Sequence, residues 1–119
     1  MKKINDFEMV KDGEKTFEEL NINTTMYCAY IATIYYTGNE TIDFNDVIWE
    51  RDIEPIVNVC RKYGISYITI SSAFSGLIET LSKFQELGCK IGSITKVKAK
   101  YNDFMSNEKA VIPAIIVEL

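Results

Sequence analysis

The sequence predicts an α+β fold, a two-layer α/β arrangement in which helices pack mainly on one face of a small three-stranded mixed sheet. Three segments carry apolar residues at helical spacing, and three others show the patterns of strands. One strand–helix–strand unit lies among them, which predicts a right-handed crossover between parallel strands. The predicted order is helix, helix, strand, helix, strand, strand, within one domain that spans residues 1–119.

The amino-terminal part is the least regular. Residues 1–13 are polar with scattered apolar positions and stop at Gly13, which is compatible with a short helix or with an ordered or mobile arm. Thr16 and Glu19 have the spacing of a capping box, in which a hydroxyl and a carboxylate each satisfy a free amide. A short helix over residues 17–20 should follow.

Residues 24–37 combine two signals. Their tyrosines and isoleucines favour a strand. The same residues recur at helical spacing, as Tyr27, Tyr30, Ile31, Ile34 and Tyr35. Gly38 stands where a helix would end. We favour a helix here, and a strand remains the alternative.

Residues 53–63 are predicted to form an amphipathic helix. Its apolar stripe consists of Ile53, Ile56, Val57 and Cys60. Asp52 can cap its start, Pro55 is tolerated in its first turn, and Gly64 ends it.

A strand and another helix should follow. Residues 65–70 are rich in β-branched and aromatic side chains, and Ser71 and Ser72 end this strand. The next helical stripe consists of Leu77, Ile78, Leu81 and Phe84. Glu79 and Lys83 are spaced to pair on its exposed side, and Gly88 stops it.

The last third of the chain predicts a hairpin. Residues 90–101 alternate, with Lys96, Lys98 and Lys100 on one face, as in a half-exposed strand. Residues 102–108 form a turn. Residues 111–119 are almost continuously apolar, which favours a strand covered on both faces and placed between the other two.

Composition excludes several function classes. The chain of 119 residues has a net charge of −4 and no histidine, so it lacks the usual partner of a serine or cysteine nucleophile and the commonest metal ligand. No cofactor, metal site or catalytic residue is predicted, and we lean towards a non-enzymatic protein. Cys28, Cys60 and Cys89 are expected to be reduced and mostly buried. Without a signal or a membrane-spanning run, a cytoplasmic location is expected.

Several runs resemble a family of small uncharacterised bacterial proteins carried largely on plasmids, prophages and other mobile elements of gut bacteria. These runs are residues 38–49, residues 70–81 with their Ser-Ser-x-Phe-Ser-Gly segment, residues 88–90 and residues 112–114. The resemblance covers roughly residues 38–119 and implies a shared fold, without an established activity. Residues 102–107 depart from the aromatic-rich turn expected in the family, so the resemblance assigns this turn no role. Residence on mobile elements would favour an inhibitor or regulator of host defence.

An acidic and aromatic segment is the first candidate site. Residues 40–54 contain six carboxylates and one arginine, a net charge of −5. Asp43, Phe44, Asp46, Trp49 and Glu50 are the predicted partner-binding residues, because an aromatic beside charge is typical of a binding hot spot. The alternatives are that the carboxylates only stabilise a helix start and that the aromatics are core anchors.

Two further candidates are weaker. Ser71, Ser72 and Ser75 lie where a strand meets a helix and could bind an anion such as phosphate, although capping and turn formation explain them as well. The basic strand face of Lys96, Lys98 and Lys100 could follow a phosphate backbone, but exposed lysines also prevent edge-to-edge aggregation.

These observations favour a non-enzymatic protein-binding module of a mobile element. It would inhibit or modulate a host defence or nucleic-acid-processing protein, as anti-CRISPR proteins do. The expected partner is a larger protein with a basic binding surface, and direct nucleic-acid or membrane binding is not expected. The alternative is a small-molecule or nucleotide-binding domain that uses residues 71–76. A homodimer is compatible with either function.

Overall fold

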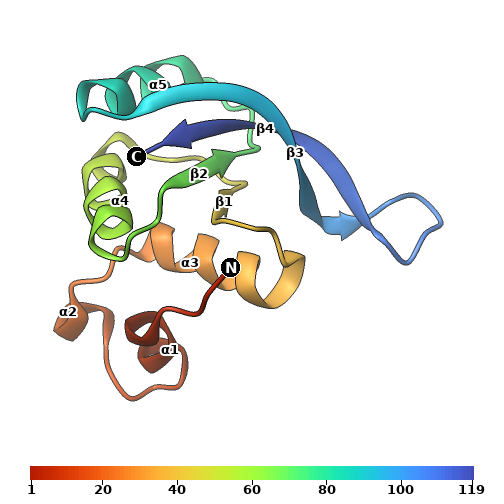
Figure 1. The fold of residues 1–119 in the computed structure, drawn as a ribbon. Helices are drawn as coiled ribbons and strands as arrows, with labels where there is room; N and C mark the ends of the chain where they lie inside the picture. Colours follow the sequence, from red (N-terminus) through yellow and green to blue (C-terminus); the bar gives the residue numbers. More distant parts are fainter.

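The computed structural model of the protein describes residues 1–119 (Figure 1). Its elements are α1 (Asn5–Lys11), α2 (Phe17–Leu20), α3 (Thr24–Ala32), the π-helical turn η1 (Thr33–Thr37), β1 (Asp43–Phe44), α4 (Glu50–Lys62), β2 (Tyr67–Ile70), α5 (Leu77–Glu86), β3 (Lys90–Asn102) and β4 (Lys109–Glu118). None of the helices combines the length and the apolar character needed to cross a bilayer.

The sheet has four strands in the order β1-β2-β4-β3, so the prediction of three strands is wrong. The missed strand, β1, has two residues and pairs in parallel with β2, Asp43 opposite Thr69 and Phe44 opposite Ile70. Two residues are too few to show an alternating pattern in the sequence. The predicted element order changes accordingly, because a strand separates the helix over residues 24–37 from α4.

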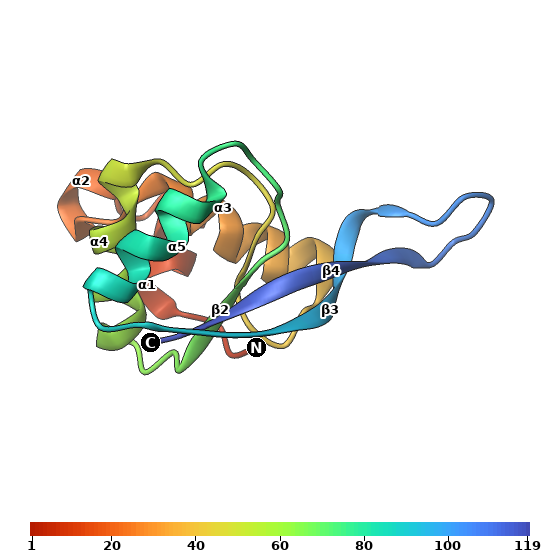
Figure 2. The same ribbon diagram turned by 90° about the horizontal axis from the view of Figure 1, so that it is seen from above.

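The mixed α+β class is confirmed, with a single sheet. Strand β4 lies between β2 and β3 and is antiparallel to both, so β2 and β3 run parallel to each other. Figure 2 shows the helices gathered on one side of these strands. The expectation that β4 is covered on both faces is wrong, because Val111, Pro113 and Glu118 are exposed. Because the helices pack on one face of the sheet, side chains of β4 on the opposite face are exposed to solvent.

The core joins the sheet to the helices. Helix α4 buries the predicted stripe of Ile53, Ile56, Val57 and Cys60, because these positions recur on one face of the helix. The rest of the buried cluster comes from α1 and α3 on one side and from β1, β2, β4 and α5 on the other. The three cysteines are free, Cys28 exposed and the other two buried.

Residues 24–37 are helical, as favoured by their spacing. Asn23 caps α3 by accepting a hydrogen bond from the amide of Met26 at 3.0 Å, and the helix ends in the wider turn η1. Gly38 adopts φ 70°, a left-handed conformation that disfavours residues with a Cβ. The buried hydroxyl of Tyr30 accepts from the amide of Ile4 and donates to Glu8, which fixes α1 against α3.

Helix α4 begins earlier than predicted. Its N-cap is Trp49, so Asp52 does not cap it and Pro55 lies inside the helix beyond the first turn. The carboxylate of Asp52 instead accepts hydrogen bonds from Asn23 and Thr25 at the start of α3. The position of Asp52 near the helix start predicts a local cap, but its partners are distant in sequence.

Helix α5 differs from its prediction at one face. Leu81 and Phe84 pack inwards with Leu77, but Ile78 is 73% exposed. Lys83 pairs with Glu86 at 3.5 Å, in place of the predicted pair with Glu79.

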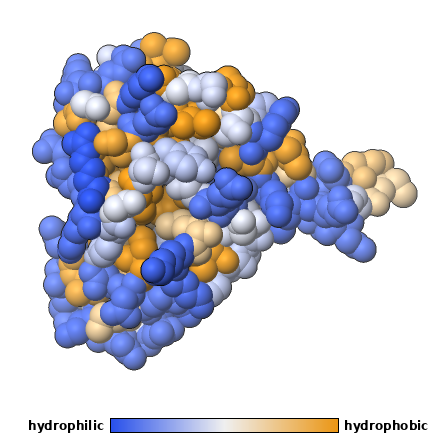
Figure 3. Space-filling view, in the orientation of Figure 1, coloured by the Kyte–Doolittle hydropathy of each residue, from blue (hydrophilic) through white to orange (hydrophobic).

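The outer part of the β3–β4 hairpin forms an arm, defined here as residues 94–113, whose turn reaches beyond the helices (Figures 1 and 2). The base of the arm packs against the rest of the chain, and Val97, Ala99 and Ala110 are buried there. Phe104 and Met105 at its turn are almost fully exposed. Figure 3 shows this hydrophobic end beyond a hydrophilic stretch. At the base of the arm, Asn39 accepts from the amide of Lys98 and donates to its carbonyl.

Replacing Phe7 with alanine tests whether α1 is part of the core. The ring is fully buried and makes an edge-to-face contact with Tyr30 at 4.9 Å. We expect Phe7→Ala to lower the free energy of unfolding by about 3–5 kcal/mol in urea denaturation. Phe104→Ala is the matched control, because its ring is 92% exposed and its loss should change stability by less than about 0.5 kcal/mol. Equal effects of the two substitutions would contradict this packing.

Candidate functional site

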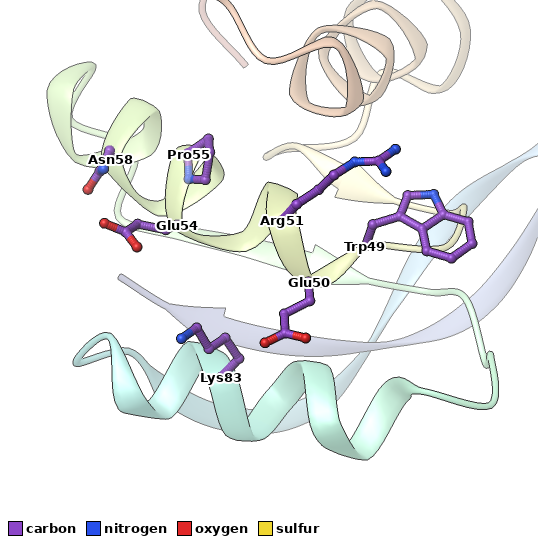
Figure 4. A pocket seen from close by; sticks show the side chains of 7 residues that line it. All are labelled: Trp49, Glu50, Arg51, Glu54, Pro55, Asn58 and Lys83. Carbon is purple, nitrogen blue, oxygen red and sulfur yellow. The ribbon is translucent and has the colours of Figure 1, made fainter.

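A groove between α4 and α5 combines apolar and charged side chains. It consists of two adjoining hollows of about 770 and 800 Å³, which share Trp49, Glu50 and Lys83. Figure 4 shows the first hollow, with Trp49 and Arg51 at one end and Glu54, Pro55 and Asn58 along α4. Hereafter these two hollows together are called the α4–α5 groove.

The segment before α4 displays Trp49 at the groove. Phe44 and Ile48 are buried in the core, whereas Val47 and Trp49, on either side of Ile48, are exposed. The indole is 57% exposed, and the guanidinium of Arg51 lies 6.0 Å from its ring centre. Because Phe44 and Ile48 are buried, the backbone at Trp49 has few accessible conformations. The indole ring is therefore held at the surface before any binding occurs.

The opposite wall comes from α5 and the turn before it. Phe74, Ser75, Gly76 and Ile78 line it, and Ile78 adds an exposed aliphatic side chain. The N-cap of α5 is Gly76, with no side-chain capping bond, so the interpretation of a serine as its cap is wrong.

The groove is acidic. Glu50, Glu54 and Glu79 line it without an ion pair, whereas its two cations, Lys83 and Arg51, are paired with Glu86 and Asp52. Figure 4 shows Glu50 extending from the start of α4 towards α5. Unpaired carboxylates beside exposed apolar side chains attract a cationic and apolar surface.

A polar cluster behind the groove holds β1 to β2. Asp43 is 8% exposed and accepts hydrogen bonds from the hydroxyls of Thr69 and Ser71, both at 2.6 Å. The side-chain amide of Asn45 donates to the hydroxyl of Ser71 at 2.9 Å. Burial raises the pKa of Asp43, and the two hydroxyls and the charge of Lys100 oppose this shift.

The structure divides the predicted partner-binding set. Trp49 and Glu50 lie together in the groove. Asp43 and Phe44 are buried in the interior, so neither can touch a partner directly. Asp46 is exposed, pairs with Lys100 at 3.7 Å and lines a different hollow from Trp49.

The other predicted residues are also dispersed. Ser71 belongs to the Asp43 cluster, Ser72 lies in the loop after β2, and Ser75 lines the groove. Lys96, Lys98 and Lys100 are exposed on the arm, and Lys100 is tied to Asp46. No group of three or more cysteine or carboxylate side chains could hold a metal ion.

Sequence reasoning missed the groove residues of α5, above all Ile78. Leu77, Leu81 and Phe84 follow an i, i+4, i+7 pattern that already defines an inward stripe, and buried Thr80 completes it. Ile78 lies about 100° from Leu77 around the helix, off this stripe. That offset is the signal that could have identified it as exposed.

A comparison with protein families assigns the chain. The model of a family described as a domain of unknown function (DUF7698) matches residues 25–119. The chain belongs to this family. The DUF7698 match confirms an uncharacterised family and starts within α3, earlier than the resemblance noted in the sequence. No curated protein and no solved structure matches the chain.

The Asp43 cluster predicts a pH dependence. The folded state raises the pKa of Asp43, so it binds this proton more readily than the unfolded state does. Lowering the pH from about 7 to about 4 should therefore stabilise the wild type relative to Asp43→Asn, and raising the pH through the folded pKa should remove this advantage. Urea denaturation of both proteins measures the difference. A difference that stays constant with pH, or that changes in the opposite direction, would contradict the raised pKa.

Proposed function

We propose that this DUF7698 protein is a non-enzymatic protein-binding module whose α4–α5 groove receives a basic and partly apolar segment of a larger protein. One observation carries the proposal. Trp49 is the only tryptophan of the chain and stands more than half exposed in a groove with three unpaired carboxylates.

The apolar lining supports an interface in this groove. Tryptophan is among the residues most enriched in binding hot spots, because its large ring buries much area at a small entropy cost. Complete burial of a large apolar side chain such as Ile78 contributes roughly 1.5–3 kcal/mol. Trp49 and Ile78 come from opposite walls, so one inserted segment could contact both.

The charges support a basic partner. Glu50, Glu54 and Glu79 would face lysine or arginine side chains across the interface, and their repulsion of phosphate argues against nucleic acid in the groove. Exposed pairs of this kind mainly increase the association rate and the specificity.

The biological role is proposed from the resemblance noted in the sequence. If the protein is encoded on a mobile element, occupation of a basic segment on a host protein would inhibit or modulate host defence or nucleic-acid processing. Many such host proteins present basic surfaces to nucleic acid, which an acidic groove can cover.

Nucleotide binding at residues 71–76 is less well supported. Ser71 donates its hydroxyl to Asp43, whose carboxylate would repel a phosphate if ionised. Ser75 lines the acidic groove near Glu79. No observation favours phosphate at this turn over the protein partner.

Removal of the indole tests the proposal. The tagged protein would be used to isolate binding proteins from a lysate of the source cells, beside Trp49→Ala and Glu50→Lys. We expect both substitutions to weaken capture of the main binding protein by at least tenfold, because they remove the apolar anchor and reverse a groove charge.

Tyr36→Ala is the matched control, because Tyr36 is a comparably exposed aromatic outside the groove. Capture by this variant should equal that of the wild type. A binding protein that is retained by Trp49→Ala and Glu50→Lys, or lost equally with Tyr36→Ala, would refute the groove as its binding site.

A further inference from the structure

The arm carries a second exposed surface with charges opposite to those of the groove. Ile94 and Val111 are 63% and 58% exposed. Val111 lies directly opposite Lys98 in the hairpin, so both point to the same face, and Ile94 and Lys96 share that face by alternation along β3. The face is therefore both apolar and basic.

Two lysines of this face are free to interact with another molecule. Lys96 and Lys98 form no ion pair, whereas Lys100 is paired with Asp46. Lys109 donates to the carbonyl of Lys100. The free cations are thus next to Ile94 and Val111, near the base of the arm.

The lysine face of the arm lies outside the groove of its own molecule. Lys96 and Lys98 line a separate hollow with residues 38–41, and Lys100 reaches Asp46, which precedes the groove residue Val47. Figures 1 and 2 both show the hairpin reaching away from α4 and α5. The arm cannot fold back into its own groove while the sheet is intact, so a contact between these surfaces needs two molecules.

The two surfaces are similar in length. From Ile94 to Asn102, β3 spans about 26 Å at roughly 3.3 Å per residue. Helices α4 and α5 are about 20 and 15 Å long at 1.5 Å per residue. The lysine-bearing part of the arm is therefore long enough to cover the groove along both helices.

We infer that the α4–α5 groove of one copy receives the arm of a second copy. Lys96 and Lys98 face Glu50 and Glu79, and the aliphatic side chains beside these lysines cover Trp49 and Ile78. This inference rests on the same groove as the proposed function, and it means that partner binding displaces the second copy.

The hairpin turn is not the part that enters the groove. Phe104 and Met105 are flanked by Asp103 and Glu108. These carboxylates would be repelled by those of the groove, whereas Lys96 and Lys98 are attracted.

A two-fold arrangement closes the assembly. When two molecules lie side by side in opposite directions, each arm is next to the helical end of the other molecule. Both contacts are then equivalent, and the dimer has no free groove that would continue into a fibre.

Charge reversal in two places tests the inference. The groove variant Glu50→Lys/Glu79→Lys and the arm variant Lys96→Glu/Lys98→Glu change only exposed side chains. Each variant alone should lose at least tenfold in dimer affinity, since like charges then meet in both contacts. An equimolar mixture should recover the dimer, because each arm of one variant is complementary to the groove of the other.

The measurements are the molar mass by light scattering and the emission of the single tryptophan. The wild type should be dimeric at low salt, dissociate as salt rises and show blue-shifted Trp49 emission in the dimer, because the indole becomes buried. Glu14→Lys/Glu18→Lys is the matched control. It has the same change in net charge on exposed residues outside the groove and should behave as the wild type.

A monomeric wild type at low salt and high concentration would overturn the inference, as would a mixture no more associated than its components. Neither result depends on the partner protein. Loss of partner capture with Trp49→Ala alongside a monomeric wild type would leave the proposed function in place and refute the dimer. A dimeric wild type that captures no partner protein would support the dimer and refute the proposed function.

Discussion

The segment from Asp43 to Trp49 is attached at both of its ends, and the shape of the α4–α5 groove depends on this constraint. Asp43 is held between two hydroxyls of β2 and its outgoing loop, and Phe44 and Ile48 are buried on the helical side. Four residues separate Phe44 from Trp49, and this span leaves little freedom once Ile48 is fixed. Val47 and Trp49 must therefore face outwards. The polar cluster thus acts on the groove through the backbone, because Asp43 itself does not line the groove.

Much of the fold could be predicted, because helix α4, helix α5 and the hairpin each have a pattern longer than one repeat. The stripe from Ile53 to Cys60 and the alternation from Lys96 to Ala99 specify burial within one element. The predictions that failed depend on pairs that are distant in sequence. Strand β1 exists because of β2, Asp52 binds to Asn23 and Thr25, and Ser71 binds to Asp43. The type of a residue does not show which distant residue it contacts in the fold.

The same distinction applies to the candidate site. An acidic and aromatic composition identified Trp49 and Glu50 as surface residues near one another, and the structure has them in one groove. It could not separate them from Asp43 and Phe44, because burial of a carboxylate depends on hydroxyls supplied by another strand. The contribution of α5 was hidden for a related reason. Ile78 is apolar and adjacent to a true core stripe, and only the angle around the helix distinguishes it.

The groove and the arm have a common origin in the unequal lengths of the strands. Strand β2 has four residues, whereas β3 and β4 have 13 and 10. Beyond β2, the turn η1 covers one face at the base of the hairpin, where Val97 and Ala99 are buried. The opposite face of the hairpin has no helix above it. Apolar side chains continue along this uncovered part, at Ile94 and Val111, where a monomer gains nothing from them. Their alternation with Lys96 and Lys98 keeps the arm soluble and makes it complementary to an acidic surface. The fold thus leaves two surfaces of opposite charge, an acidic one between α4 and α5 and a basic one on the exposed face of the hairpin.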